Sequence, residues 1–286
     1  MTKWIWALLA LAVSGTAAAK DREPEVLTLS SKWIARYETD ACNLVAQFGT
    51  GDRAMIAMLT RYQPGDDFDL TLIGKQVRYP EASVDAKVDF GIQADARRSV
   101  MLGNMGERPA MFFKSLRLDG WQWKENQLPP RVTPEQEKGV VGVTVSIAAK
   151  TPLRLVTKSG LAKPMAALRT CMDDLIKSWG YDPAEQAALS KPAMPLSPPP
   201  SWFHSDDYPL SAMRGGHNGH VQFRLDIDPT GKIAGCHVLA RTNPDDFADL
   251  TCKLIQKRGG FSPALDAAGK PVRSYFIKAV RFMIGG

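Results

Sequence analysis

The chain has 286 residues, of which 44% are hydrophobic and 23% are charged, a balance typical of a folded protein and not of a disordered one. Its formal net charge of +6 is a mild basic excess without the clustered basic stripe of a nucleic-acid-binding surface. We therefore predict a globular protein of one large or two ordinary domains that does not bind nucleic acid.

Residues 1–19 have the pattern of a cleavable signal peptide. Lys3 is the charged start, Trp4 to Val13 form an apolar core, and Ala17-Ala18-Ala19 offers an A-x-A cleavage site before Lys20. The uncharged run from residue 4 to residue 19 has 16 residues, just short of the roughly 17–25 that a spanning helix needs. We expect an exported protein with no membrane span after cleavage. The alternative is an uncleaved inner-membrane anchor.

The cysteines form an even set, as expected of an exported protein in an oxidising compartment. They are Cys42, Cys171, Cys236 and Cys252. Their placement favours the bridges Cys42–Cys171 and Cys236–Cys252, one in each half, although three connectivities are open. Metal ligation or a reactive thiol is the competing interpretation, but no pair has the tight C-x-x-C spacing usual for those sites.

Residues 20–182 predict a mainly-β domain, a sandwich or a barrel-like fold, because short β-like runs alternate with turn residues. The candidate strands are Trp33–Tyr37, Asn43–Phe48, Ala54–Tyr62, Phe68–Ile73, Lys87–Ile92, Ser99–Leu102, Met111–Leu118, Val140–Ala148 and Leu153–Thr157. The stretch Gln127–Lys138 is interpreted as a break between strands.

A helix closes this domain. Its apolar residues recur at steps of three and four from Met165 to Trp179, and Gly180 is placed to end it. Cys171 lies at the edge of the apolar stripe, from where it can reach back to Cys42 on an early strand. This bridge would tie the last element of the domain to one of its first.

Residues 183–201 form a proline-rich linker, which we interpret as a semi-rigid spacer without regular structure. Residues 202–286 predict a small α+β domain. The run Val221 to Ile227 alternates apolar and polar residues, and Asp228-Pro229-Thr230-Gly231 suits a type I turn into a second strand. A helix with the cap Asn243 follows, and Gly259 ends it.

The last strand, predicted over Arg273–Ile284, is apolar on both parities. Phe276, Val280 and Phe282 share one parity, whereas Tyr275 and Ile277 lie on the other. Such a strand, at the end of a three-stranded sheet, is either covered by the first helix of the domain or left available for pairing with another chain.

The C-terminal segment resembles the C-terminal domain of the TonB energy-transducer family. The resemblance rests on Tyr208-Pro209, the alternating strand from Gly219 to the Asp228-Pro229-Thr230-Gly231 turn, Phe261-Ser262-Pro263-Ala264 and Gly269-Lys270-Pro271-Val272. It covers roughly residues 202–286 and implies a periplasmic β-β-α-β module with an antiparallel sheet.

The resemblance also implies a binding mode. In that family a short extended segment of an outer-membrane transporter adds a strand to the edge formed by the last strand. The corresponding partner-binding residues here are Arg273, Tyr275, Ile277, Ala279, Arg281 and Met283. Transducers of the family keep an N-terminal anchor and a long proline-rich spacer, whereas this chain has a predicted signal peptide and a large β domain.

The first functional hypothesis is a non-enzymatic periplasmic protein that binds an envelope partner by strand addition, without cofactor or metal. The second is an envelope scaffold that forms a homodimer through the TonB-like domain. An anchored energy transducer and an enzyme with its site in the N-terminal domain are further alternatives. The sequence contains none of the nucleophile, metalloprotease or phosphate-binding motifs that would favour an enzyme, and residues 20–182 contain no histidine.

Overall fold

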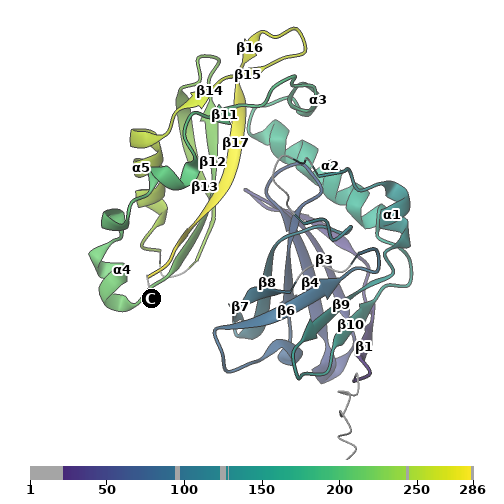
Figure 1. Ribbon diagram of the computed structural model, residues 1–286. Coiled ribbons are helices and arrows are strands. Elements are labelled where there is room, and N and C mark those ends of the chain that lie inside the picture. Colours follow the sequence, from purple (N-terminus) through teal and green to yellow (C-terminus); the bar gives the residue numbers. More distant parts are fainter. Residues whose placement is uncertain (1–21, 94–96, 123–126, 128, 243–244, 285–286) are drawn as a thin grey trace, which may run out of the picture.

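The computed structural model describes residues 22–284 except residues 94–96, 123–126, 128 and 243–244. It has a large, curled N-terminal β-sheet and a smaller C-terminal region of helices and sheets (Figure 1). The prediction of two regions with a β-rich N-terminal part is thus confirmed. The predicted signal peptide lies outside the described residues. Of the helices in the described part, none is both long and apolar enough to cross a membrane.

The N-terminal sheet has ten strands in the spatial order β1-β10-β9-β6-β7-β8-β5-β4-β3-β2. Their bounds are β1 (Glu25–Thr28), β2 (Ile34–Tyr37), β3 (Cys42–Phe48), β4 (Met55–Arg61), β5 (Phe68–Ile73), β6 (Ser83–Asp89), β7 (Arg98–Met105), β8 (Arg108–Leu116), β9 (Gly142–Ile147) and β10 (Leu153–Val156). The β1–β10 pair is parallel, and the other pairs are antiparallel.

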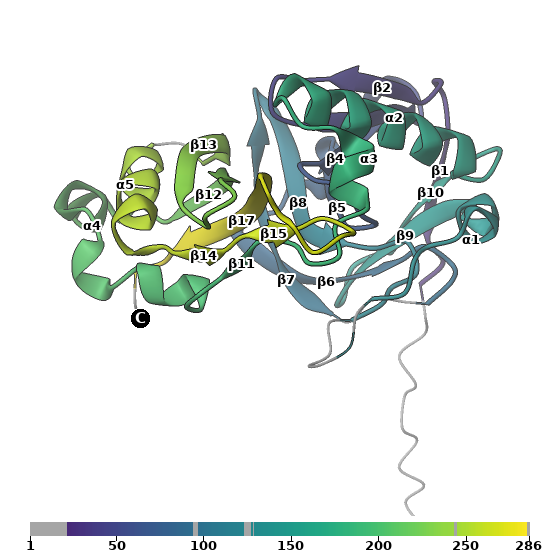
Figure 2. The ribbon, with the colours of Figure 1, turned by 90° about the horizontal axis from the view of Figure 1, so that it is seen from above.

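The sheet is curled into a barrel-like shape, and a contact just beyond β1 joins its two ends. Leu29 donates its N–H to the carbonyl of Val156 at 2.9 Å, and it also forms an isolated bridge with Phe48 at the end of β3. The contact links β1, at one end of the strand order, with β3, the neighbour of the strand at the other end. The two ends of the sheet therefore meet (Figures 1 and 2).

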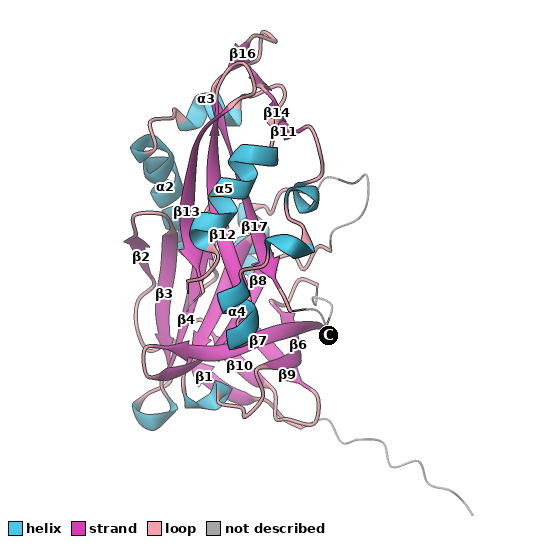
Figure 3. Cartoon of the chain, turned by 90° about the vertical axis from the view of Figure 1, so that its left-hand side faces the viewer, coloured by secondary structure: helices cyan, strands magenta, loops and turns pink. Residues whose placement is uncertain are grey.

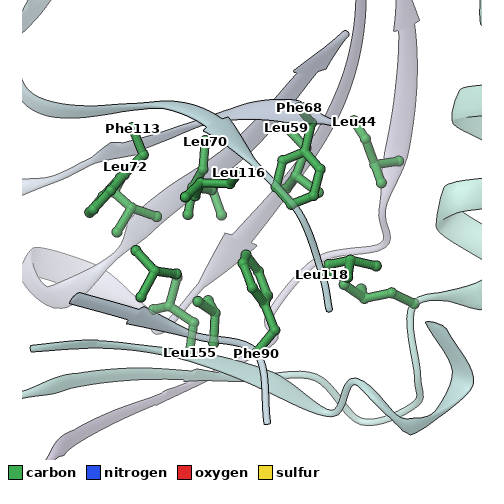
Figure 4. Close-up of a cluster of buried hydrophobic side chains, with 14 of the residues drawn as sticks. Leu44, Leu59, Phe68, Leu70, Leu72, Phe90, Phe113, Leu116, Leu118 and Leu155 are labelled. Carbon is green, nitrogen blue, oxygen red and sulfur yellow. The ribbon is translucent and has the colours of Figure 1, made fainter. Parts of the chain in front are cut away.

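The main hydrophobic core lies inside the curled sheet. Alternate residues of β3 and β4 are buried, as the two-residue period of a strand requires. Leu70 and Leu72 of β5 face Phe90 and Leu155 from the opposite side of the interior (Figure 4). Phe68 and Phe90 meet edge to face with ring centroids 5.7 Å apart. One continuous cluster therefore stabilises the N-terminal region.

The predicted helix is α2 (Ala162–Ser178), which packs across β2 and β3 (Figure 2). It buries the stripe that includes Met165, Leu168 and Met172. Cys171 forms the disulfide with Cys42 on β3, with the Cα atoms 5.9 Å apart. The bridge that the sequence favours for this half is thus present.

One strand and one α-helix of this region are missing from the sequence-based prediction. The short β1 buries only Leu27 fully and depends on distant β10 for pairing. The helix is α1 (Pro134–Gly139), which lies in the stretch interpreted as a break. Its start has a capping box, in which Thr133 and Gln136 satisfy each other's backbone N–H groups. The 3-10 turns η1 (Gly51–Arg53) and η2 (Lys75–Val77) complete the region.

The proline-rich segment 183–201 contains regular structure, contrary to the spacer interpretation. Pro183 begins α3 (Pro183–Ala187), because proline is tolerated in the first turn of a helix, where its missing N–H costs nothing. Farther along, β11 (Met194–Pro195) pairs with a strand of the C-terminal region, and Ala193 is buried in the core of that region. The segment is therefore packed against the C-terminal region along part of its length.

The C-terminal region is built around a three-stranded antiparallel sheet in the order β13-β12-β17. Its elements are η3 (Pro199–Trp202), η4 (Ser205–Asp207), α4 (Leu210–Gly215), β12 (Gly219–Ile227), β13 (Ile233–Arg241), α5 (Ala248–Arg258), β14 (Phe261–Ser262), β15 (Ala264–Leu265), β16 (Pro271–Val272) and β17 (Ser274–Phe282). Helix α5 lies across one face of the sheet (Figure 3). Its Cys252 forms the second favoured disulfide, with Cys236 of β13.

The predicted turn joins β12 to β13. The side chain of Asp228 accepts hydrogen bonds from the N–H groups of Thr230 and Lys232, at 2.8 and 3.0 Å. Gly231 has a φ of +86°, and a Cβ atom there would lie 2.2 Å from the carbonyl oxygen of Phe261. Glycine is therefore required at this position for both backbone conformation and space. The predicted cap of the next helix, Asn243, lies outside the described residues.

Candidate partner-binding strand

The last strand, β17, is an edge strand of the C-terminal sheet. Within the described residues it pairs on one side only, with β12, and its register is continuous from Ser274, opposite Ile227, to Phe282, opposite Gly219. The other edge strand, β13, is irregular, because its register with β12 shifts at two places. The sheet thus has one regular and one bulged edge.

One face of β17 packs into the core beneath α5. The ring of Phe276 lies 5.1 Å from that of Phe261 and 6.5 Å from that of Trp202. Farther along, Phe282 stacks on Phe247 with ring centroids 4.4 Å apart. These contacts explain why Phe276 and Phe282, which lie on the same face of the strand, are apolar.

The second face of β17 turns toward the N-terminal region, so the sheet lies between that region and α5 (Figure 1). The ring of Tyr275 lies 5.6 Å from that of Trp179 and 5.2 Å from that of Tyr181, both at the end of α2. Ile277, on the same parity, is 8% exposed. The N-terminal region therefore covers the first half of this face.

A polar network fixes the same junction. The carboxylate of Asp226 on β12 accepts hydrogen bonds from Arg224 Nε at 3.1 Å and from the Tyr181 hydroxyl at 3.0 Å, and it lies 2.8 Å from His237 Nε2. The guanidinium of Arg224 also lies over the Trp179 ring at 4.4 Å. Burial raises the pKa of Tyr181 to about 12, so its hydroxyl is a hydrogen-bond donor at neutral pH.

The structure divides the six predicted partner-binding residues into two groups. Arg273, Tyr275 and Ile277 lie at the junction, where the backbone carbonyl of Arg273 accepts a hydrogen bond from Gln186 at 3.2 Å. The other three, Ala279, Arg281 and Met283, are exposed. The sequence did not single out Tyr181 or Gln186. The one signal for Tyr181 was an aromatic residue directly after the predicted end of α2.

The histidines of this region do not converge on a common site. Nδ1 of His217 lies 2.6 Å from Asp246. His220 is held at the junction, where burial and the nearby charge of Lys114 lower its pKa to about 4. No group of three or more His, Cys, Asp and Glu side chains arranged for a metal ion occurs in the described part of the chain.

Comparison with known sequences identifies the family of the C-terminal region. No curated protein matches this chain. Residues 205–284, however, match the family model described as the Gram-negative bacterial TonB protein C-terminal. The match begins at η4 and extends past the end of β17, so it includes the whole three-stranded sheet and α5. The C-terminal region is therefore a domain of the TonB C-terminal family, as its resemblance predicted.

Proposed function

We propose that this protein is a non-enzymatic periplasmic binding protein that takes up an extended segment of an envelope partner as an additional strand on β17. The observation that carries the proposal is the regular, one-sided pairing of β17 in a domain of the TonB C-terminal family. An unpaired strand edge presents backbone N–H and C=O groups that can pair with another chain.

The contrast between the two edges of the sheet favours β17 over β13. Bulges twist a strand and interrupt its row of hydrogen-bonding groups, so the irregular β13 is a poor template for a further strand. The disulfide from Cys236 also ties β13 to α5. The nine register pairs of β17 with β12 run without a shift, which leaves its outer edge regular.

The accessible part of that edge is the second half of β17 and the residues just after it, 278–284. At the start of β17 the backbone carbonyls of Arg273 and Ser274 already accept hydrogen bonds, from Gln186 and from the Tyr181 hydroxyl. In the second half Lys278 and Arg281 are exposed on opposite faces of the strand. Since opposite charges on adjacent strands are stabilising, we expect a partner segment with acidic residues at the facing positions.

The proposal is tested by titrating isotope-labelled protein, residues 20–286, with extended segments of outer-membrane transporters. We expect the amide resonances of residues 278–284 to shift, and those of β13 to stay in place. If no segment perturbs any amide of β17, strand addition at this edge is excluded.

Proline substitutions give a matched control. Backbone N–H groups of neighbouring residues point to opposite edges of a strand, so only one of Lys278→Pro and Ala279→Pro removes an outward N–H. We expect that variant to fold and to lose peptide binding. The variants Lys278→Thr and Ala279→Thr keep both N–H groups and should bind as the unmodified protein does.

The second candidate function is an envelope scaffold in which two copies pair through the same edge. It is favoured by the exposed apolar side chains at the end of the strand, Met283 at 54% and Ile284 at 40% exposure. Measuring the mass in solution over a range of concentrations separates the two. A strict monomer at high concentration excludes the scaffold, and a dimer that Met283→Lys dissociates supports it.

A further inference from the structure

A cavity of about 560 Å³ lies at the junction of the two regions. Its walls come from the end of β4, the loop that follows, α2, α3 and Tyr275 of β17. The volume is within the range of small-molecule sites, and such sites occur preferentially where two domains meet. The cavity is separate from the exposed second half of β17.

The most unusual group in this cavity is the side chain of Arg61. It ends β4 on the parity of the buried Met55, Ala57 and Leu59, so the alternation of the strand directs a cation to the interior. The residue is 2% exposed, and its Nε has no hydrogen-bond partner. Burial lowers its pKa to about 10, against the opposing effect of the Asp66 carboxylate.

Of the other arginines in the cavity wall, Arg117 and Arg169 have carboxylate partners, and Arg131 is exposed to solvent. Arg117 forms a two-point contact with Asp119 at 2.9 and 2.8 Å, and it donates to the carbonyl of Pro130 at 2.5 Å. Arg169 makes a similar contact with the buried Glu137, at 2.5 and 3.0 Å. Within the described residues, Arg61 has no such contact.

The carboxylates near the cavity do not replace that missing partner. Asp66 accepts a hydrogen bond from the backbone N–H of Val132 at 3.0 Å and lies 3.8 Å from Arg117. Asp67 lines the cavity from an exposed position. A buried cation without a hydrogen-bonded partner is costly, and a carboxylate or phosphate matches the planar donors of a guanidinium.

We propose that this cavity binds a small molecule that carries an oxyanion, a carboxylate or a phosphate, with Arg61 as the group that receives it. Asp67 and Asp173 on the same wall would accept hydrogen bonds, so the site favours a ligand that also bears hydroxyl or other donor groups. Its binding would contact α2, α3 and β17 together.

Calorimetric titration of the protein, residues 20–286, at low salt tests the proposal with two probes, inorganic phosphate and malate. We expect one probe or both to bind saturably at one site, and the probe that binds identifies the oxyanion class. The variant Arg61→Met should weaken that binding by about thirtyfold or more, since it removes one partner of a buried charge pair. The control Arg154→Met changes an exposed arginine on β10 and should leave binding unchanged.

The melting temperature gives a second measurement. Without probe, the Arg61→Met variant should melt no lower than the unmodified protein, because the substitution replaces an unpaired buried charge with an apolar side chain. The binding probe should raise the melting temperature of the unmodified protein and not that of the variant. The proposal is overturned if neither probe binds saturably, if Arg61→Met binds as well as the unmodified protein, or if this variant alone loses much of its stability in probe-free buffer.

Discussion

The two regions of this molecule bury their strands in different ways. The N-terminal sheet curls around its own interior, so its ten strands enclose a single core. The C-terminal sheet has three strands and two smaller core clusters, and it cannot cover both of its faces alone. Helix α5 covers one face, and the end of α2 covers half of the other (Figure 1).

This difference shows what the N-terminal region does for the proposed binding strand. The N-terminal region covers the apolar side chains on the second face of β17 as far as Ile277, so that only the second half of the strand is left for a partner. The comparison predicts that changes within one region act on the stability of that region, whereas changes at the junction act on how the sheet is held and on the few titratable groups that the contact buries.

The largest expected effect comes from removing a disulfide, and it should differ between the regions. By the loop-entropy model, the double variant C42A/C171A opens a loop of 129 residues and loses about 5 kcal/mol, whereas C236A/C252A opens one of 16 residues and loses about 3 kcal/mol. Urea unfolding of each variant measures the two losses. Equal losses would contradict an effect set by loop length.

The next effect is a pH dependence at the junction. His220 is neutral in the folded protein down to pH about 4, because it is buried near Lys114 and Arg281, whereas the opposing charge of Asp69 raises its pKa. In the unfolded chain the imidazole takes up its proton near its ordinary pKa of 6.5. Between these values the unfolded chain binds more protons, so stability falls as pH falls, by up to about 3 kcal/mol.

The variant His220→Gln tests this dependence, because glutamine does not titrate. Urea unfolding at pH 8 gives the cost of the substitution itself, since the histidine is then neutral in both states. From pH 6.5 to pH 4 the variant should lose less stability than the unmodified protein by the same 3 kcal/mol or so. Parallel pH profiles would show that His220 does not charge on unfolding.

Much of the N-terminal fold could be predicted from local patterns, because its strands alternate and are separated by turn residues. The nine predicted strands each overlap a strand of the structure. The missed β1 has four residues, and its pairing with β10 is not visible locally. The missed α1 does carry a local signal, the capping-box spacing of Thr133 and Gln136, but it lies in a stretch whose composition favours a break between strands.

The candidate site was predictable only in part. Apolar residues at both odd and even positions of β17 indicate that both faces of this strand are covered. They do not indicate which residues cover the second face. That cover comes from Trp179 and Tyr181, nearly a hundred residues earlier in the sequence. The burial of Arg61 has a local signal, because it is a charged residue at an inward-facing position of a predicted strand. That its Nε lacks a hydrogen-bond partner is not visible in the sequence, since this depends on how α2 and the surrounding loops pack.

The smallest expected effect is at the Tyr181 hydroxyl, which contacts Asp226 at 3.0 Å and the carbonyl of Ser274 at 3.1 Å. Tyr181→Phe keeps the ring against Tyr275 and removes the polar contacts of the hydroxyl, so we expect a loss of about 1 kcal/mol. Hydrogen exchange should become faster at residues 274–277 and stay unchanged in the N-terminal strands. Tyr37→Phe, at an exposed tyrosine of β2, is the matched control. If exchange at residues 274–277 is the same in both variants, the junction is held by ring packing alone, and the polar network around Asp226 does not restrain β17.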